Sequence, residues 1–387
     1  MLDTCLTDAS VLFRTDDGET VVGVRPNQSR EADIVVRVFR ETFFSQVLCH
    51  GNLGLGEAFM AGDFEMEKGE LYELLTILLR NRVNENVGKD ARTLLKIAAY
   101  RVANALSGKQ KNVQRHYDIG FDLFESFLDS RMVYSCGYAN TPEDDLEQLQ
   151  TNKLDRICRK LDLKAGDHVL DIGCGFGGFL AFAASEYGAT GTGITISRDH
   201  CYRGNAILSK RGLSDRVRIE FRDHRAMEGR FDKVVSVGML EHVPRSEYRH
   251  YFRNIARVLK PKGMGLVHAV GCNSPQNEHD PFIQKYIFPA SNQPKLSEIS
   301  SFLERNRLAI VDVENIIRHY HPTAVAWLNQ FRSNKGKLDS QKYDSRFHKM
   351  WEYYLSCAAA AALASDAAVF QVLFTNDYAG PMRLQRV

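Results

Sequence analysis

Short apolar stretches alternate with helical patterns between residues 113 and 270 of the chain. The short stretches predict buried strands, and the longer segments between them predict helices. Strands separated by helices pair in parallel and are covered on both faces, so this region is predicted to be a doubly wound α/β domain. The expected strands are 168–172, 190–196, 217–221, 233–237 and 265–270, with helices at 179–187 and 199–211.

The first third of the chain follows a different pattern. Residues 1–30 are polar and rich in turn formers, which predicts loose order. An apolar run from Ile34 predicts a strand, and residues 51–57 carry turn-forming glycines. Residues 70–80 and 90–106 have apolar positions at helical spacing, so two helices are expected there.

A chain of 387 residues exceeds the size of one ordinary core and predicts two domains. The polar stretch that starts at Ser107 is a suitable hinge. We expect a smaller N-terminal α+β domain, associated with lipid or membrane, over residues 1–108 and a catalytic domain over residues 109–387. A hydrophobic fraction of 44% is ordinary for a globular protein, and a net charge of +2 argues against nucleic acid as a partner.

The eight cysteines form no Cys-x-x-Cys pair, which favours a reducing, cytoplasmic setting and predicts no metal site. We see no secretory leader at the N-terminus, and no apolar run reaches the roughly 18 residues of a membrane span. The Ala-rich stretch 356–368 is interrupted by Asp366 and is predicted to be a buried helix.

A glycine-rich loop follows the strand at residues 168–172. Gly173, Gly175 and Gly178 fit the Gly-x-Gly-x-x-Gly pattern of nucleotide-binding turns, which by itself also suits a dehydrogenase. The next strand ends Gly-Ile-Thr-Ile-Ser, without the acid that usually binds an NAD ribose. Asp171, at the strand tip, can face a cationic amino group. The stretch Val-Leu-Asp-Ile-Gly-Cys-Gly-Phe-Gly-Gly resembles the first motif of class I S-adenosylmethionine methyltransferases.

Further segments extend the resemblance beyond the cofactor loop. They are His116-Tyr-Asp-Ile-Gly-Phe-Asp-Leu-Phe, Leu128-Asp-Ser-Arg-Met-Val-Tyr-Ser-Cys-Gly-Tyr, Val235-Ser-Val-Gly-Met-Leu-Glu-His-Val, Leu266-Val-His-Ala-Val-Gly and Asp280-Pro-Phe-Ile-Gln-Lys-Tyr-Ile-Phe-Pro. In this order they resemble the cyclopropane-fatty-acyl-phospholipid synthase family, which includes the mycolic acid cyclopropane synthases. The resemblance runs from about residue 30 to the C-terminus, so it includes the N-terminal extension of the phospholipid enzymes.

The resemblance implies a lipid-modifying reaction. A methylene group passes from S-adenosylmethionine to the cis double bond of an unsaturated phospholipid acyl chain, and a bound bicarbonate ion deprotonates the carbocation so that a cyclopropane ring closes. It also implies that the protein is a homodimer that binds peripherally to the cytoplasmic face of the inner membrane. Residues 89–115 are basic and partly amphipathic, which makes them the expected membrane-docking segment.

The residues that match the family's bicarbonate cage are Cys136, Glu241, His268 and Tyr320. Tyr320 is flanked by two histidines, so a small shift in the match would change that assignment. Each residue also has a purely structural alternative. Cys136 could be a small buried hydrophobe, Glu241 could cap a helix, and His268 could be an ordinary core histidine.

The cofactor-binding residues implied by the resemblance surround the glycine loop. They are Tyr134, Ser135, Asp171, Gly173, Cys174, Gly175, Gly177, Thr195, Ser197, His200, Asp223 and His224. Asp223 is expected to accept a hydrogen bond from the adenine amino group, and His224 to stack on the adenine. Three residues depart from the family pattern: Phe121 replaces a usual Asn, Phe176 replaces a usual Trp, and His200 replaces a Gln that often contacts the cofactor ribose.

Two other functions share these motifs. A methyl-branching enzyme would transfer the methyl group to the same lipids without closing the ring, and it would differ only in how the cation is resolved. A lipid-binding or scaffolding protein that has lost catalysis would retain the fold, but the intact cofactor loop argues against it. Binding of S-adenosylmethionine distinguishes this last alternative from both enzymes.

Overall fold

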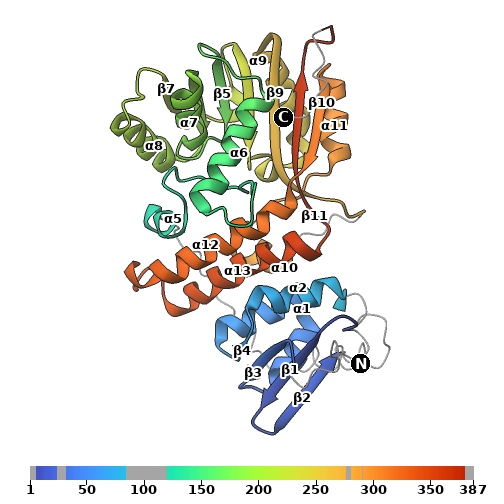
Figure 1. Cartoon of the computed structure of the whole chain (residues 1–387). Coiled ribbons are helices and arrows are strands. Elements are labelled where there is room, and N and C mark those ends of the chain that lie inside the picture. The colour runs from blue at the N-terminus through green and yellow to red at the C-terminus, as the bar shows by residue number, and fades with distance from the viewer. Residues whose placement is uncertain (1–5, 24–31, 84–119, 276–279, 290, 380–387) are drawn as a thin grey trace. The chain divides into compact units, whose positions relative to one another are not determined.

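The computed structural model describes residues 6–23, 32–83, 120–275, 280–289 and 291–379 (Figure 1). The chain forms two compact units, each assembled from separate stretches of sequence. The first contains residues 1–127, 278–289 and 327–365, and the second contains residues 128–277, 290–326 and 366–387. Residues 278–289 and 327–365 therefore belong with the N-terminal unit. A single division of the chain at residue 108 assigns them to the other domain. The expected hinge itself lies outside the described residues.

The first unit contains a four-stranded sheet in the order β2-β1-β3-β4. Its strands are β1 (Ser10–Thr15), β2 (Gly18–Gly23), β3 (Ile34–Val38) and β4 (Phe64–Lys68). Strands β1 and β2 form an antiparallel hairpin in which Thr15 pairs with Gly18. The prediction of loose order was therefore wrong for residues 10–23, because the chain reverses in a tight two-residue turn at Asp16 and Asp17 between the paired Thr15 and Gly18. The strand predicted from Ile34 is confirmed.

The helices of the first unit correct two further predictions. They are α1 (Thr42–Ala61), α2 (Leu71–Arg80), α5 (Phe121–Phe127), α10 (Pro281–Tyr286) and α13 (Ser345–Ala364). Residues 51–57 are not a turn between elements, because α1 continues through them with a kink at Gly51, whose φ is 55°. The Ala-rich helix is buried as predicted but ends at Ala364, and residues 367–368 belong to a strand instead. The helix predicted at 90–106 lies outside the described residues.

The second unit contains a seven-stranded sheet in the order β10-β11-β9-β8-β5-β6-β7. The strands are β5 (His168–Ile172), β6 (Thr190–Thr195), β7 (Val217–Phe221), β8 (Phe231–Val237), β9 (Leu259–Cys272), β10 (Ala309–Asn315) and β11 (Ala367–Thr375). The first five are parallel, as predicted. The last two are antiparallel additions that the sequence pattern did not predict.

Two apolar cores cover the two faces of this sheet. Helices lie against both faces (Figure 1). Val169 packs in the core shared with α6 (Leu146–Lys160), α7 (Gly178–Tyr187) and α8 (Arg198–Lys210). The neighbouring Leu170 packs in the opposite core, with α9 (Tyr248–Val258) and α11 (Leu296–Arg305). Successive side chains of a strand point to opposite faces, so a strand covered on both sides is apolar throughout. The doubly wound α/β prediction is confirmed.

In the part of the chain that the structure describes, no helix is both long and apolar enough to cross a membrane. The helix α12 (Tyr320–Asn334) contains the point at which the chain passes from the second unit to the first. All residues predicted for the active site belong to the second unit. Most of them follow the carboxyl ends of the parallel strands, where ligands bind in open α/β sheets.

Candidate active site

The glycine loop joins β5 to α7 in a strained backbone path. Gly173, Gly175 and Gly177 have φ angles of 77°, 55° and 83°, a region that favours glycine. The N–H groups of Gly173 and Cys174 both donate to the carbonyl oxygen of Ile194, which ties the loop to β6. A Cβ atom at Gly175 would meet no protein atom within 4 Å. The space beside Gly175 is therefore open to a ligand that approaches the backbone.

Asp171 lies at the tip of β5 and is buried. Burial raises the pKa of its carboxyl group to about 7, although the nearby Lys153 opposes the shift. Lys153 is also buried and donates a hydrogen bond of 2.8 Å to the hydroxyl of Ser135. Gln150 donates to the Ser135 carbonyl oxygen at 2.9 Å, so α6 holds the Tyr134–Ser135 segment from two sides.

The hydroxyl groups that follow β6 are bound by their own backbone. Thr195 accepts from the N–H of Ser197 at 3.1 Å, and Ser197 caps α8 by accepting from the N–H of His200 at 3.2 Å. The His200 ring lies against the Phe176 ring, with centroids 4.4 Å apart. Phe176 and His200, two of the three departures from the family pattern, are therefore in contact, so each substitution changes the surroundings of the other.

Asp223 and His224 follow β7 in a short 3-10 turn (His224–Ala226). The Asp223 carboxylate binds the Arg225 side chain through two hydrogen bonds of 2.9 and 2.8 Å, and this partner lowers its pKa to about 2. The buried His224 ring packs edge-on against Tyr251, with centroids 5.6 Å apart. Its Nδ1 atom has no hydrogen-bond partner among the described residues. Asp223 is thus ionised and held in position beside a buried imidazole that has an unused nitrogen.

Glu241 lies in a 3-10 turn (Leu240–His242) that follows β8, and its side chain is buried. One carboxylate oxygen, Oε1, accepts from the N–H of Val270 on β9. The other oxygen, Oε2, meets no hydrogen-bond partner within the described ranges. Burial raises the pKa of the carboxyl group to about 7. A buried acceptor without a partner is costly in a folded protein, so Oε2 is positioned for a ligand.

His268 lies on β9, two residues before Val270, and is buried. Its Nε2 atom also lacks a hydrogen-bond partner among the residues that the structure describes. Burial lowers the pKa of the imidazole to about 3, so the ring is neutral at physiological pH. Glu241 is bonded to Val270, which is two residues from His268 on β9, so both side chains belong to the same part of this strand.

Cys136 and Tyr320 complete this region. The buried Cys136 forms a small apolar cluster with Ile316 and Val369, and Tyr320 and Val270 pack against the cluster. Burial raises the pKa of the Cys136 thiol well above its usual range, so the sulfur is an uncharged thiol and a poor nucleophile. The structure thus brings Cys136, Glu241, His268 and Tyr320 together around Val270.

The neighbours of Tyr320 have other contacts. His319 stacks on Tyr138 with ring centroids 3.9 Å apart, and its Nδ1 accepts from the N–H of Ala139 at 3.1 Å. Tyr320 packs against the cluster that contains Cys136, as the sequence match expects of a residue in this site.

Sequence reasoning missed three buried residues that support the predicted site. Lys153 bonds Ser135, Gln371 lies against His268, and Lys160 bonds Gln371. Lys153 and Lys160 are two turns apart on α6, a spacing that usually marks an exposed charged face, but both are buried. Gln371 is the one polar residue inside the apolar run from Ala368 to Phe374, and that isolated amide was the available signal.

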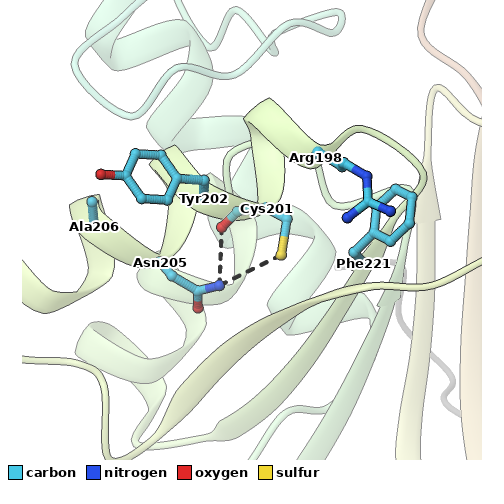
Figure 2. Close-up of a pocket in the computed structure, with 6 residues that line it drawn as sticks. All are labelled: Arg198, Cys201, Tyr202, Asn205, Ala206 and Phe221. Atoms are coloured by element: carbon cyan, nitrogen blue, oxygen red, sulfur yellow. Dashed lines mark hydrogen bonds between the residues drawn. The ribbon is translucent and has the colours of Figure 1, made fainter.

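A separate hollow lies on the outer side of α8 and the end of β7 (Figure 2). It is lined by Arg198, Cys201, Tyr202, Asn205, Ala206 and Phe221. The Arg198 guanidinium lies 4.3 Å from the Phe221 ring centroid, and Asn205 bonds the carbonyl oxygen and sulfur of Cys201. None of the predicted site residues lines this hollow, so it is distinct from the region around Glu241 and His268.

Comparison with known proteins agrees with this geometry. Residues 105–372 match the family described as mycolic acid cyclopropane synthetase. A cyclopropane-fatty-acyl-phospholipid synthase of Escherichia coli K12 is 36% identical over 366 residues, covering 94% of this chain and 93% of that protein. A probable fatty acid methyltransferase of Pseudomonas putida is 32% identical over 332 residues, covering 84% of this chain and 82% of that protein.

Comparison with solved structures gives a similar protein. The crystal structure of mycolic acid cyclopropane synthase CmaA1 complexed with SAH and CTAB has a TM-score of 0.63 and 25% sequence identity to this chain. The likeness covers 68% of this chain and 97% of that chain. The chain therefore belongs to the mycolic acid cyclopropane synthetase family and is an S-adenosylmethionine-dependent methyltransferase.

Proposed function

We propose that the chain converts the cis double bond of an unsaturated phospholipid acyl chain into a cyclopropane ring. The observation that carries this proposal is the pair of buried atoms, Glu241 Oε2 and His268 Nε2, that lack partners among the described residues. Val270, which donates to Glu241, packs against the apolar cluster that contains Cys136. A small polar site among apolar side chains suits a reaction that must remove one proton from a lipid cation.

The unused atoms fit a bicarbonate ion in chemical character. Bicarbonate has one hydroxyl donor and several acceptor oxygens, so it needs an acceptor and donors from the protein. Glu241 Oε2 can accept the hydroxyl proton, while the Nε2–H of His268 and the Tyr320 hydroxyl can donate. When bound, S-adenosylmethionine supplies the methyl group and bicarbonate supplies the base that takes one proton from it. The protein orients that base and excludes water, because a buried site leaves few competing proton acceptors.

The cofactor would be held along the ends of β5, β6 and β7. The open backbone at Gly175 admits close approach, and the buried Asp171 is next to the loop. The Ser197 hydroxyl, whose oxygen accepts from the His200 backbone, retains a proton that it can donate to a ribose. The ionised Asp223 can accept from an adenine amino group, and the neighbouring His224 offers a ring beside it.

The alternative product is a methyl-branched chain, and one of the named relatives is described as a probable fatty acid methyltransferase. Glu241 Oε2 and His268 Nε2, which lack partners among the described residues, favour ring closure because they can orient a bound base. We propose to express the chain in bacteria that lack a synthase of their own and to analyse their phospholipids by mass spectrometry. Cyclopropane-containing chains are expected. Chains with a methyl branch would identify the alternative, and unchanged chains would overturn both.

A matched variant tests the site in the same cells. Glu241→Gln keeps the bond to Val270 but replaces the free acceptor oxygen by an amide NH2 group, which cannot accept from a bicarbonate hydroxyl. Turnover is expected to fall far more than affinity for S-adenosylmethionine. Normal turnover of this variant in bicarbonate-depleted buffer would contradict the role proposed for Glu241.

We further propose that the enzyme acts as a homodimer on the cytoplasmic face of the inner membrane, bound peripherally through residues 89–115. This segment lies outside the described residues, and the proposal depends on its charge. Changing Lys109, Lys111 and Arg115 together to Glu should weaken sedimentation with anionic vesicles at low salt. The same charge change at the exposed residues Lys164, Lys210 and Lys337 is the control. Equal vesicle binding by both triple variants would exclude residues 89–115 as the docking segment. The molar mass from light scattering tests whether the protein is a dimer.

A further inference from the structure

A chain of buried hydrogen bonds lies behind His268. Gln371 on β11 stands opposite His268 on β9 in the antiparallel register, where the two strands run side by side (Figure 1). The Gln371 Nε2 atom lies 3.3 Å from His268 Nδ1, and the Gln371 Oε1 atom accepts from Lys160 Nζ at 2.8 Å. Both Gln371 and His268 are almost completely buried, so no solvent competes for these contacts.

Lys160 determines which way the Gln371 amide points. An ammonium group only donates, so the amide oxygen must face Lys160 and the amide NH2 must face His268. Burial lowers the pKa of Lys160, but Glu314, at 2.6 Å, opposes that shift and favours the charged form, and Glu314 also binds Arg156 at 2.8 Å. The cations keep the pKa of Glu314 at about 2, so this acid remains ionised.

The orientation of the amide in turn determines the tautomer of His268. An NH2 group cannot accept, so His268 Nδ1 must be the unprotonated nitrogen. The single proton of the neutral ring is then on Nε2, which is the atom that lacks a partner among the described residues. The imidazole therefore presents a donor, and not an acceptor, at the buried nitrogen that no described residue bonds.

We propose that Lys160 and Gln371 are positioning residues that hold His268 as the Nε2–H tautomer, so that it donates to an anion in the active site. The inference rests on the proposed function, since it assigns the anion to the reaction. An opposite tautomer would turn a lone pair toward the anion and leave Glu241 as a second acceptor beside it. Both the charge and the hydrogen-bond pattern would then oppose binding.

Nuclear magnetic resonance of the ligand-free protein labelled with 15N-histidine tests the proposal directly. The nitrogen shifts distinguish a protonated from an unprotonated ring nitrogen, and a His268→Asn variant identifies the His268 signals by their loss. The wild type should show a protonated Nε2 and an unprotonated Nδ1. A protonated Nδ1 would overturn the proposal, whether or not any variant folds.

Gln371→Glu is the matching perturbation because it has the same size and still accepts from Lys160. Its carboxylate can only accept, so it should draw the His268 proton to Nδ1 and reverse the two nitrogen signals. We expect turnover to fall about a hundredfold, within the range lost when one oxyanion-binding donor is removed, while the dissociation constant for S-adenosylmethionine is unchanged. Reversed signals with normal turnover would refute the functional part of the proposal.

Two lysine variants separate positioning from structural support. Lys160→Arg retains a donor toward Gln371 and should keep the wild-type tautomer, whereas Lys160→Met should allow the amide to turn and both tautomers to appear. A single, unchanged tautomer in Lys160→Met would contradict the relay. The histidine spectra report the tautomer whatever lipid the enzyme makes. If the proposed function were wrong, the lipids made by the wild type would show it while the spectra stayed as expected.

Discussion

Replacing Glu241 by glutamine should make the protein more stable at high pH while it abolishes activity. Burial raises the pKa of this carboxyl group from 4.5 to about 7. A shift of that size corresponds to about 3 kcal/mol, at about 1.4 kcal/mol per pH unit. The folded state keeps the proton to a higher pH than the unfolded state does. The contribution of the protonated group to stability is therefore complete below pH 4.5 and is lost as the pH rises through about 7.

Glutamine is neutral at every pH and can still accept from the N–H of Val270 through its amide oxygen. At pH 8 the free energy of unfolding of Glu241→Gln should exceed that of the wild type by up to about 3 kcal/mol, and near pH 4 the two should agree within about 1 kcal/mol.

Urea unfolding at the two pH values, in buffer depleted of bicarbonate and without cofactor, measures this difference. Glu304→Gln on the exposed side of α11 is the control, and it should change stability by less than about 0.5 kcal/mol at either pH. A Glu241→Gln variant that is less stable than the wild type at pH 8 would refute the reasoning. It would mean that the folded protein stabilises the charged carboxylate.

Three further predictions concern the cofactor site. Gly175→Val should lower the affinity for S-adenosylmethionine by about tenfold or more in calorimetry, because its side chain enters the open space beside the loop. Gly212→Val has similar backbone strain and open space but lies at the end of α8, so its affinity should not change. A double-mutant cycle of Phe176→Trp and His200→Gln should show a coupling of about 0.5–1.5 kcal/mol in cofactor binding, because the two rings are in contact; additive effects would contradict this. Asp171→Asn should weaken cofactor binding most at pH 8, where the wild-type carboxyl group, with its pKa near 7, is ionised, and equal weakening at pH 6 would exclude a charge interaction.

Local pattern was sufficient for the parallel strands and the glycine loop. The strands predicted at 168–172 and 217–221 agree with β5 and β7 to the residue. The central β5 is mostly apolar because it is covered on both faces, whereas the edge strand β7 alternates apolar and polar residues. The hairpin of β1 and β2 was missed although the turn-forming residues Asp16, Asp17 and Gly18 are a local signal for it. The turn expected at 51–57 failed for a different reason. Glycine is compatible with a helix when packing stabilises it, and here the strain is confined to the kink at Gly51.

The partners of the site residues depended on the tertiary structure. The contact of Gln371 with His268 joins positions 103 residues apart, and its contact with Lys160 joins positions 211 apart. Residue type and periodicity identify a polar group on an apolar strand, but the register between β9 and β11 decides which group it meets. Likewise, the sequence identified Glu241 as a candidate, while only the fold determined that one carboxylate oxygen is bound by Val270 and the other is not. Hydrogen bonds between distant segments depend on how the sheet is assembled and on what is excluded from water, and neither is a property of a local stretch of sequence.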